Sequence, residues 1–215
     1  MRYFKTIAAI FLFAIFSCER KADSTEQVNK IDSLPSVDKN TYASADQSPM
    51  DMSYYPAGYP LQKMAGKDTS GSPIARVIYS RPHKKGRQVF GDSQKSLCRY
   101  GRPWRLGANE ATEIEFFRTV KIGGKDVAPG RYVIYCIPYA DHWTIILNSN
   151  LYTWGLHMDS SKDILKVEIV TMDLNPALED FTMVFLPSDN GADLLMAWDN
   201  VKAILPIIFT QNATN

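Results

Sequence analysis

The stretch RYVIYCIPYADHWTIILN, from Arg131 to Asn148, decides the fold class of this chain. It contains two runs, RYVIYCIP (131–138) and HWTIILN (142–148), with a short polar break between them. Both runs are rich in β-branched and aromatic residues and contain positions that alternate with a period of two. This pattern is typical of β-strands that bury one face.

Runs of the same kind recur on both sides of this stretch, and none shows a long helical period. The turn residues Gly123-Gly124, Pro129-Gly130 and PSDNG (187–191) separate some of them. We expect eight to ten strands in an all-β antiparallel β-sandwich of the jelly-roll or immunoglobulin-like kind. Besides the two runs above, the expected strands are IARVIYS (74–80), RQVF (87–90), TEIEFFRTV (112–120), DILKVEIVTM (163–172), EDFTMVFLP (179–187), DLLMAWD (193–199) and VKAILPIIF (201–209). Ahead of them, MDMSYYPAGYP is expected to be an irregular arm, followed by a short strand over 61–65.

The N-terminus has the pattern of an export signal. Arg2 and Lys5 precede an apolar run from Ile7 to Phe16, which is too short to span a bilayer and has the length of a signal-peptide core. The run ends in Ile15-Phe16-Ser17-Cys18, which resembles a bacterial lipobox, so residues 1–17 are interpreted as a lipoprotein signal peptide and Cys18 as the acylated residue. The alternatives are a cleaved secretory signal with an incidental cysteine and a retained transmembrane helix.

The signal is followed by a polar segment, residues 18–47, with few large apolar residues. Such a composition cannot bury enough surface to offset its ordering entropy, which predicts a flexible tether. The folded domain is expected over residues 48–209, with a tail at 210–215. The chain has 215 residues and 45% hydrophobic residues, enough for one domain with a core.

The charge pattern argues against nucleic acid as a partner. The net charge of +1 becomes −1 without Arg2 and Lys5, and the densest basic patch, RPHKKGR (81–87), is short enough to be a solvated loop. The three histidines have no metal-ligand spacing, and we expect neither a metal nor a cofactor. Cys98 and Cys136 could pair in an exported chain, or Cys136 could be a small core residue.

The segment PWRLGANEAT (103–112) is the main candidate for a functional surface. One interpretation is structural: Trp104 closes the end of the sandwich, Arg105 pairs with a carboxylate such as Glu110 or Glu113, and Asn109 holds the loop. The other is functional: Arg105, Asn109 and Glu110 face a cleft, where a guanidinium fork binds carboxylate or phosphate. Trp104 and Tyr100 would then form a stacking wall.

Two other segments could join this site. Arg81 and Arg87 flank the basic patch, and they could reach the same cleft if both loops lie at one end of the sandwich. Alternatively, Arg81 braces its loop through backbone carbonyls. Trp154, beside Gly155 in NLYTWGLHMD, could offer an exposed stacking surface, whereas Trp143 and Trp198 are expected in the core.

The sequence gives little support for catalysis. It has no G-x-S-x-G elbow and no recognisable Ser-His-Asp arrangement. Glu110 with Glu113 or Glu115 could supply paired carboxylates, although alternation places Glu113 and Glu115 on a solvated strand face. His157 near Asp159 is a further acid–base possibility.

Four blocks of the chain resemble the DUF2911 family, a domain of unknown function common in Bacteroidetes envelope proteins. In order, they are ARVIYSRPHKKGRQVFG, YGRPWRLGANEATEIEF, PGRYVIYCIP and HWTIILN. The resemblance implies a β-rich exported domain over roughly Met50 to Ile208 and no established activity.

The sequence thus favours a protein anchored in the cell envelope through a lipid on Cys18. Its domain would bind a small anionic, saccharide or peptide ligand at a loop-end cleft. The alternatives are a hydrolase-type enzyme that uses Glu110 or His157 with Arg105, and a purely structural or partner-binding module. The oligomeric state is left open.

Overall fold

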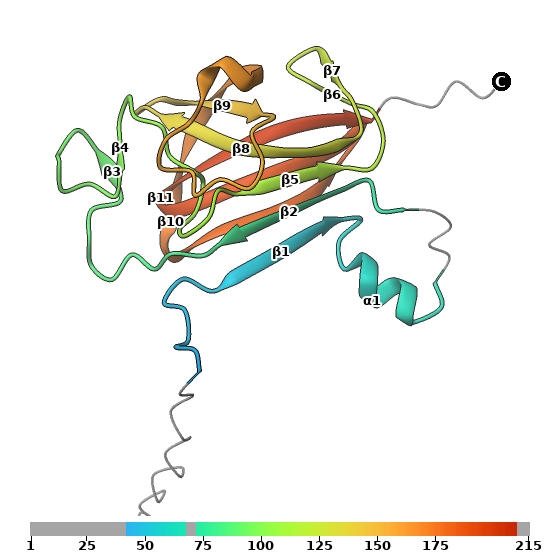
Figure 1. Cartoon of the computed structure of the whole chain (residues 1–215), viewed down its shortest axis with the longest axis horizontal. Helices are drawn as coiled ribbons and strands as arrows, with labels where there is room; N and C mark the ends of the chain where they lie inside the picture. The colour runs from blue at the N-terminus through green and yellow to red at the C-terminus, as the bar shows by residue number, and fades with distance from the viewer. Residues whose placement is uncertain (1–41, 68–71, 210–215) are drawn as a thin grey trace, which may run out of the picture. The chain divides into compact units, whose positions relative to one another are not determined.

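A nine-stranded antiparallel sheet dominates the computed structural model, which describes residues 42–67 and 72–209. The predicted signal peptide, Cys18, most of the tether and the tail lie outside these residues. The strand order is β1-β2-β5-β8-β9-β10-β11-β6-β7, and every pair within it is antiparallel (Figure 1). The bounds are β1 Met50–Tyr55, β2 Ala75–Ser80, β5 Glu113–Phe116, β6 Val120–Ile122, β7 Lys125–Val127, β8 Gly130–Pro138, β9 His142–Asn148, β10 Asp163–Ser188 and β11 Gly191–Phe209.

Four short elements complete the described structure. The helix α1 (Tyr59–Met64) follows β1, the 3-10 helix η1 (Ser160–Lys162) precedes β10, and the strands β3 (Phe90–Gly91) and β4 (Cys98–Arg99) form a separate parallel pair. The mostly β, antiparallel character predicted from the sequence is confirmed. In the described residues β1 and β7 are the ends of the large sheet and do not pair with each other.

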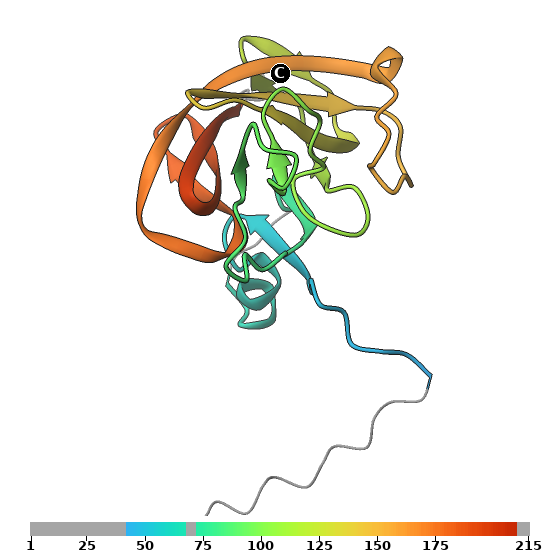
Figure 2. The same cartoon turned by 90° about the vertical axis from the view of Figure 1, so that its left-hand side faces the viewer.

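The long strand β10 joins two parts of the sheet. It pairs with β9 over Asp163–Val170 and with β11 over Thr171–Ser188. Figure 2 shows this strand, in orange, curving around one side of the domain. The two parts therefore face each other and enclose one buried cluster, to which β2, β5, β8, β9, β10 and β11 all contribute.

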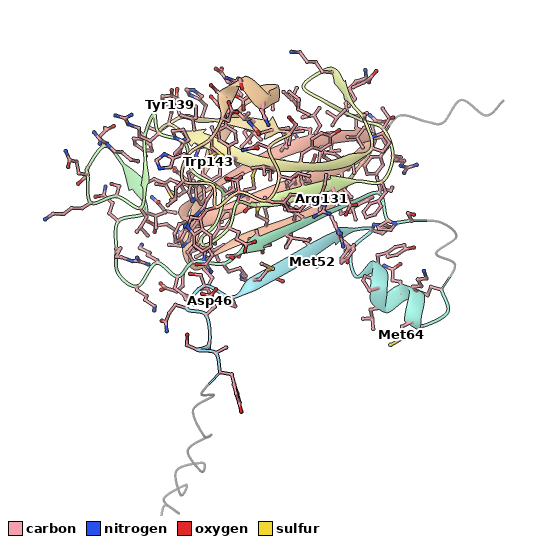
Figure 3. The ribbon with its side chains drawn as sticks, in the orientation of Figure 1. Asp46, Met52, Met64, Arg131, Tyr139 and Trp143 are labelled. Carbon is pink, nitrogen blue, oxygen red and sulfur yellow. The ribbon has the colours of Figure 1, made fainter. Side chains whose placement is uncertain are left out.

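The stretch 131–148 forms β8 and β9, as predicted, and both are buried over most of their length. Trp143 and Trp198 are buried in the core, also as predicted; Figure 3 labels Trp143 at the end of the sheet next to β3 and β4. The runs 163–172 and 179–187 were expected to be separate strands, but both lie in β10. Shifts in the β10–β11 register at 173–182 absorb the turn-like residues between them.

Two predictions for the start of the domain are wrong. MDMSYY is not an irregular arm but the edge strand β1, whose residues pair from Met50 with Ser80 to Tyr55 with Ala75. The expected strand over 61–65 is the helix α1 instead. Gly58 turns the chain at a positive φ of 65°, and Pro60 in the first helical turn has no N–H that would need a partner there.

Candidate functional site

Trp104 forms the floor of the candidate site. Its backbone pairs with Cys136 of β8, with N–H to O distances of 2.7 and 2.9 Å. The indole is 8% exposed, and its ring centroid lies 4.9–5.9 Å from four other aromatic rings: Phe90, Trp143, Phe181 and Trp198. Trp104 is therefore part of the aromatic core.

Gly107 fixes the next part of the loop against the end of β2. A Cβ atom at Gly107 would lie 2.9 Å from the carbonyl oxygen of Ser80 and 3.1 Å from Thr112 Oγ1. Thr112 is buried and donates its hydroxyl to the carbonyl of Leu106 at 2.6 Å. The loop therefore has a defined shape, because any side chain at 107 would push it away from the sheet.

Arg105 points toward the loop that contains Trp154. Its Nη1 donates to the Trp154 carbonyl at 2.9 Å, and its guanidinium carbon lies 5.8 Å from the centroid of the Trp154 ring. Partial burial lowers the pKa of Arg105, but a guanidinium group stays charged in proteins. The expected pairing with Glu110 or Glu113 is absent among the described residues, and Glu113 accepts from Arg131 Nη1 at 3.1 Å instead.

The loop of residues 150–158 packs directly on the segment 103–112. The amide of Ala111 donates to the Thr153 carbonyl at 3.2 Å. A Cβ atom at Gly155 would lie 3.0 Å from the Cβ atoms of both Arg105 and Ala111, so only glycine permits this approach. Trp154 itself is 56% exposed, as its stacking role would require.

A pocket of about 370 Å³ opens where these loops meet, and Cys98 and Arg99 of β4 belong to its lining. We call it the arginine pocket, because four of the side chains that line it are arginines and, among the described residues, none is acidic. The full lining is Ser48, Pro82, Arg87, Leu97, Cys98, Arg99, Arg102, Pro103, Trp104, Arg105, Gly107, Ala108, Gly155, Leu156 and Trp198.

None of the four arginines has a carboxylate within ion-pair distance in the described part of the chain. Arg99 and Arg102 are exposed and make no side-chain hydrogen bond there. Arg87 is oriented by backbone, since its Nε donates to the Lys84 carbonyl at 2.9 Å and its Nη2 to the His83 carbonyl. Four positive charges therefore line this pocket, and no carboxylate of the described residues pairs with them.

The structure brings Arg87, Trp104 and Arg105 together in this pocket and places Arg81 outside it. The Arg81 side chain donates to Asp51 at 3.1 Å, to the Phe181 carbonyl at 3.2 Å and to the Thr182 hydroxyl at 3.2 Å. These contacts join β1 to β10. Arg81 therefore braces the sheet, partly through a backbone carbonyl.

Tyr100, Asn109 and Glu110 also lie outside the pocket lining. Tyr100 packs half-buried against the core, and burial raises its pKa. Asn109 has a positive φ of 59° and donates its amide to Asp46 and to the Ser48 carbonyl, which is the loop-holding role. Glu110 is exposed and lines a different hollow of about 240 Å³, next to Arg131 and Tyr152.

Two arginines of the pocket, Arg99 and Arg102, were missed by the sequence analysis. The feature that could have indicated them is their spacing, since CRYGRPWR places Arg99, Arg102 and Arg105 three residues apart. Spacing alone does not distinguish a shared site from a solvated loop, and the convergence depends on the backbone turn at Gly101, where φ is 69°.

The described residues do not assemble a nucleophile with a base in this pocket. Cys98 is the one thiol in its lining, and burial raises the pKa of that thiol well above its usual value, which keeps it protonated and unreactive. His157 is exposed, while its suggested partner Asp159 accepts from Ser161. No cluster of three metal-ligating side chains occurs in residues 42–67 and 72–209.

Cys98 and Cys136 are free, buried thiols. Both belong to the core cluster around Trp104. In this structure they are therefore small core residues and not the two halves of a disulfide. Within the described residues, no helix is both long and apolar enough to cross a bilayer.

Comparison with known proteins gives one match. A family model described as "Protein of unknown function (DUF2911)" covers residues 61–207. It includes every strand from β2 to β10, most of β11, and nearly all of the arginine pocket. No curated protein and no solved structure matches the chain.

Proposed function

The chain belongs to the DUF2911 family, which has no described activity, and we propose that its domain binds a small organic anion in the arginine pocket. The observation that supports this proposal is the convergence of Arg87, Arg99, Arg102 and Arg105 on one pocket with no acidic side chain in its described lining. Clustered positive charge of this kind creates a positive local potential, which attracts anions.

The chemistry of the pocket suits an acid with an apolar body. A guanidinium group offers a planar fork of donors that matches a carboxylate or phosphate, and such bonds are stronger than neutral ones. The floor is apolar, since Trp104 and Trp198 are buried there. The volume of about 370 Å³ lies at the lower end of the range of about 300–1,000 Å³ for small-molecule sites.

The test compares an acid with its neutral analogue on the full-length chain in detergent micelles. We expect galacturonate to raise the melting temperature and galactose to leave it unchanged. At a concentration 100 times its Kd, a ligand adds about 2.7 kcal/mol to the free energy of unfolding. Arg99→Gln and Arg102→Gln should each weaken galacturonate binding without changing the melting temperature of the free protein.

Lys125→Gln serves as the matched control, because Lys125 is an exposed cation on β7, at the far end of the domain from the pocket (Figure 1). Equal loss of binding in Lys125→Gln and Arg99→Gln would mean that net charge, and not the pocket, attracts the acid. That result would refute the proposal that the arginine pocket binds an organic anion.

We further propose that the domain is a lipid-anchored protein of the cell envelope. The support is in the sequence: the Arg2 and Lys5 start, the apolar run 7–16 and the lipobox-like Ile15–Cys18. The finer fold assignment, a jelly-roll or immunoglobulin-like sandwich, is also a proposal. It is supported by the large buried cluster that lies between the two parts of the sheet.

A further inference from the structure

A second hollow adjoins the arginine pocket. It has a volume of about 410 Å³ and is lined by Gln47, Ser48, His83, Lys85 and Arg87. Two of these residues, Ser48 and Arg87, also line the arginine pocket. The two hollows therefore adjoin each other at Ser48 and Arg87.

The second hollow presents cations on a fixed backbone. Lys85 is exposed, and its ammonium donates to Gln47 Oε1 at 3.1 Å; it forms no ion pair with a carboxylate among the described residues. The loop is attached to β10, since the amide of Lys84 donates to the Glu179 carbonyl at 2.8 Å and that of Lys85 to Glu179 Oε1 at 2.7 Å.

The His83 ring lies against the carboxylate of Asp180, so a negative group already occupies its side of the hollow. Lys85 and Arg87 are therefore the two cations of this hollow that an anion would meet. Arg87 lies between the hollows, with its orientation set by the backbone carbonyls of residues 83 and 84.

We propose that the two hollows form one elongated site for an acidic oligosaccharide, with acid groups on successive sugar units. This inference rests on the proposed function, since the arginine pocket would hold the first acidic unit. Arg87 and Lys85 would hold the acid of the next unit. The exposed side chains of Trp154 and Leu156 stand beside the arginine pocket and offer apolar surface to the C–H face of a sugar ring.

The experiment measures Kd for monomer and trimer on the full-length chain in detergent micelles. One arm uses galacturonate and trigalacturonate, and a second uses galactose 6-sulfate and a sulfated galactose trisaccharide, which separates carboxylate from sulfate as the acid. We expect the trimer of at least one arm to bind about tenfold more tightly than its monomer, the size of one added charge-assisted hydrogen bond.

The variants separate the two hollows. Lys85→Gln should remove the advantage of the trimer and leave monomer binding unchanged, whereas Arg99→Gln should weaken monomer and trimer alike. Lys125→Gln should change neither Kd. Monomer binding with no gain for either trimer, or a trimer advantage that survives Lys85→Gln, would overturn the elongated site and leave the arginine pocket standing. Failure of both monomers to bind would overturn both proposals.

Discussion

Trp104 lines the arginine pocket, and Trp154 lies against Arg105 of that pocket, but the two indole rings are in opposite environments. Trp104 is 8% exposed among four other rings, whereas Trp154 is 56% exposed and contacts the guanidinium of Arg105. We expect Trp104→Ala to lower the free energy of unfolding by about 3–5 kcal/mol, the cost of a large buried cavity. Trp154→Ala should cost less than about 1 kcal/mol, the size of an exposed cation–π contact.

Urea denaturation of both variants measures these two values. Similar losses for the two tryptophans would contradict the assignment of Trp104 to the buried floor and of Trp154 to an exposed loop. Galacturonate binding adds a second readout, because Trp154→Ala should weaken binding while the fold remains intact.

Asn109 combines a backbone requirement with a side-chain one. Its φ of 59° is unfavourable for most side chains, and its amide donates to Asp46 and to the Ser48 carbonyl. Asn109→Gly keeps the backbone conformation and loses only the hydrogen bonds, so we expect a cost of about 0.5–1.5 kcal/mol. Asn109→Ala loses both and should cost about 1–2 kcal/mol more. Equal melting temperatures for the two variants would show that the backbone conformation is not limiting.

Individual residues of the core could be predicted from the sequence, whereas the pocket could not. Trp143 and Trp198 lie in apolar runs, and that local pattern is enough to predict burial. The pocket instead depends on which loops meet, and Arg99 looks the same in the sequence whether its loop meets another or faces water. The adjacency of Arg105 and Trp154 follows from the packing of Gly155 on Ala111, which is a tertiary contact.

Among the elements, β8 and β9 were predictable because their apolar residues are consecutive and their turn is short. The full length of β10 could not be predicted. The residues around Asn175-Pro176 are typical of a turn, but here they lie where the β10–β11 register shifts, and the strand continues to Ser188. A bulge and a turn use the same residue types. Local pattern therefore predicted two strands where the partner strand β11 supports one.

The loop between β9 and β10 is held by a buried polar network. Asn148 is 1% exposed and donates to the Asp159 carbonyl at 2.8 Å and to Asp163 Oδ1 at 2.7 Å. Tyr135 donates its hydroxyl to the same carboxylate at 2.9 Å, and burial together with this carboxylate raises the Tyr135 pKa, which keeps the phenol protonated as a donor. The network closes the base of the loop that carries Trp154.

We expect Asn148→Ala to lower the free energy of unfolding by about 1–3 kcal/mol, because the two hydrogen bonds that its amide donates are lost. Hydrogen exchange of the amides in 150–158 should also accelerate, since the base of the loop is released. Asn150→Ala is the matched control: its side chain makes no hydrogen bond in the described residues, so its effect should stay within about 0.5 kcal/mol. Unchanged exchange in Asn148→Ala would refute the bracing role.

For the whole molecule, the envelope proposal predicts an acylated N-terminus. In a host with two membranes, labelling with an alkyne fatty acid should mark the wild-type chain and leave Cys18→Ala unlabelled, because the thiol is the site of diacylglyceryl transfer. Cys18→Ala should also move from the membrane to the soluble fraction. Label retained by Cys18→Ala would refute the lipoprotein assignment.

The residues just before β1 connect the start of the domain to its site. Asp46 accepts from Asn109, Gln47 accepts from Lys85 at 3.1 Å, and Ser48 lines both hollows; Figure 3 labels Asp46 close to the start of β1. Pro49 is the first residue beyond them, and its carbonyl accepts from the Arg81 amide at 2.9 Å. Residues 46–48 therefore contact the loops around the two hollows and are not part of the sheet.

This division predicts different outcomes for two truncated chains. A chain beginning at Ala45 and one beginning at Pro49 should both give β-type circular dichroism and one cooperative unfolding transition, since β1 and the core are present in each. The chain from Pro49 should be less stable by about 1–2 kcal/mol, because only exposed or half-exposed hydrogen bonds are lost. It should nevertheless bind galacturonate more weakly than the chain from Ala45, as it lacks the Ser48 wall. Equal affinity in the two chains would place the anion elsewhere, because a ligand in either hollow contacts a wall that the shorter chain does not have.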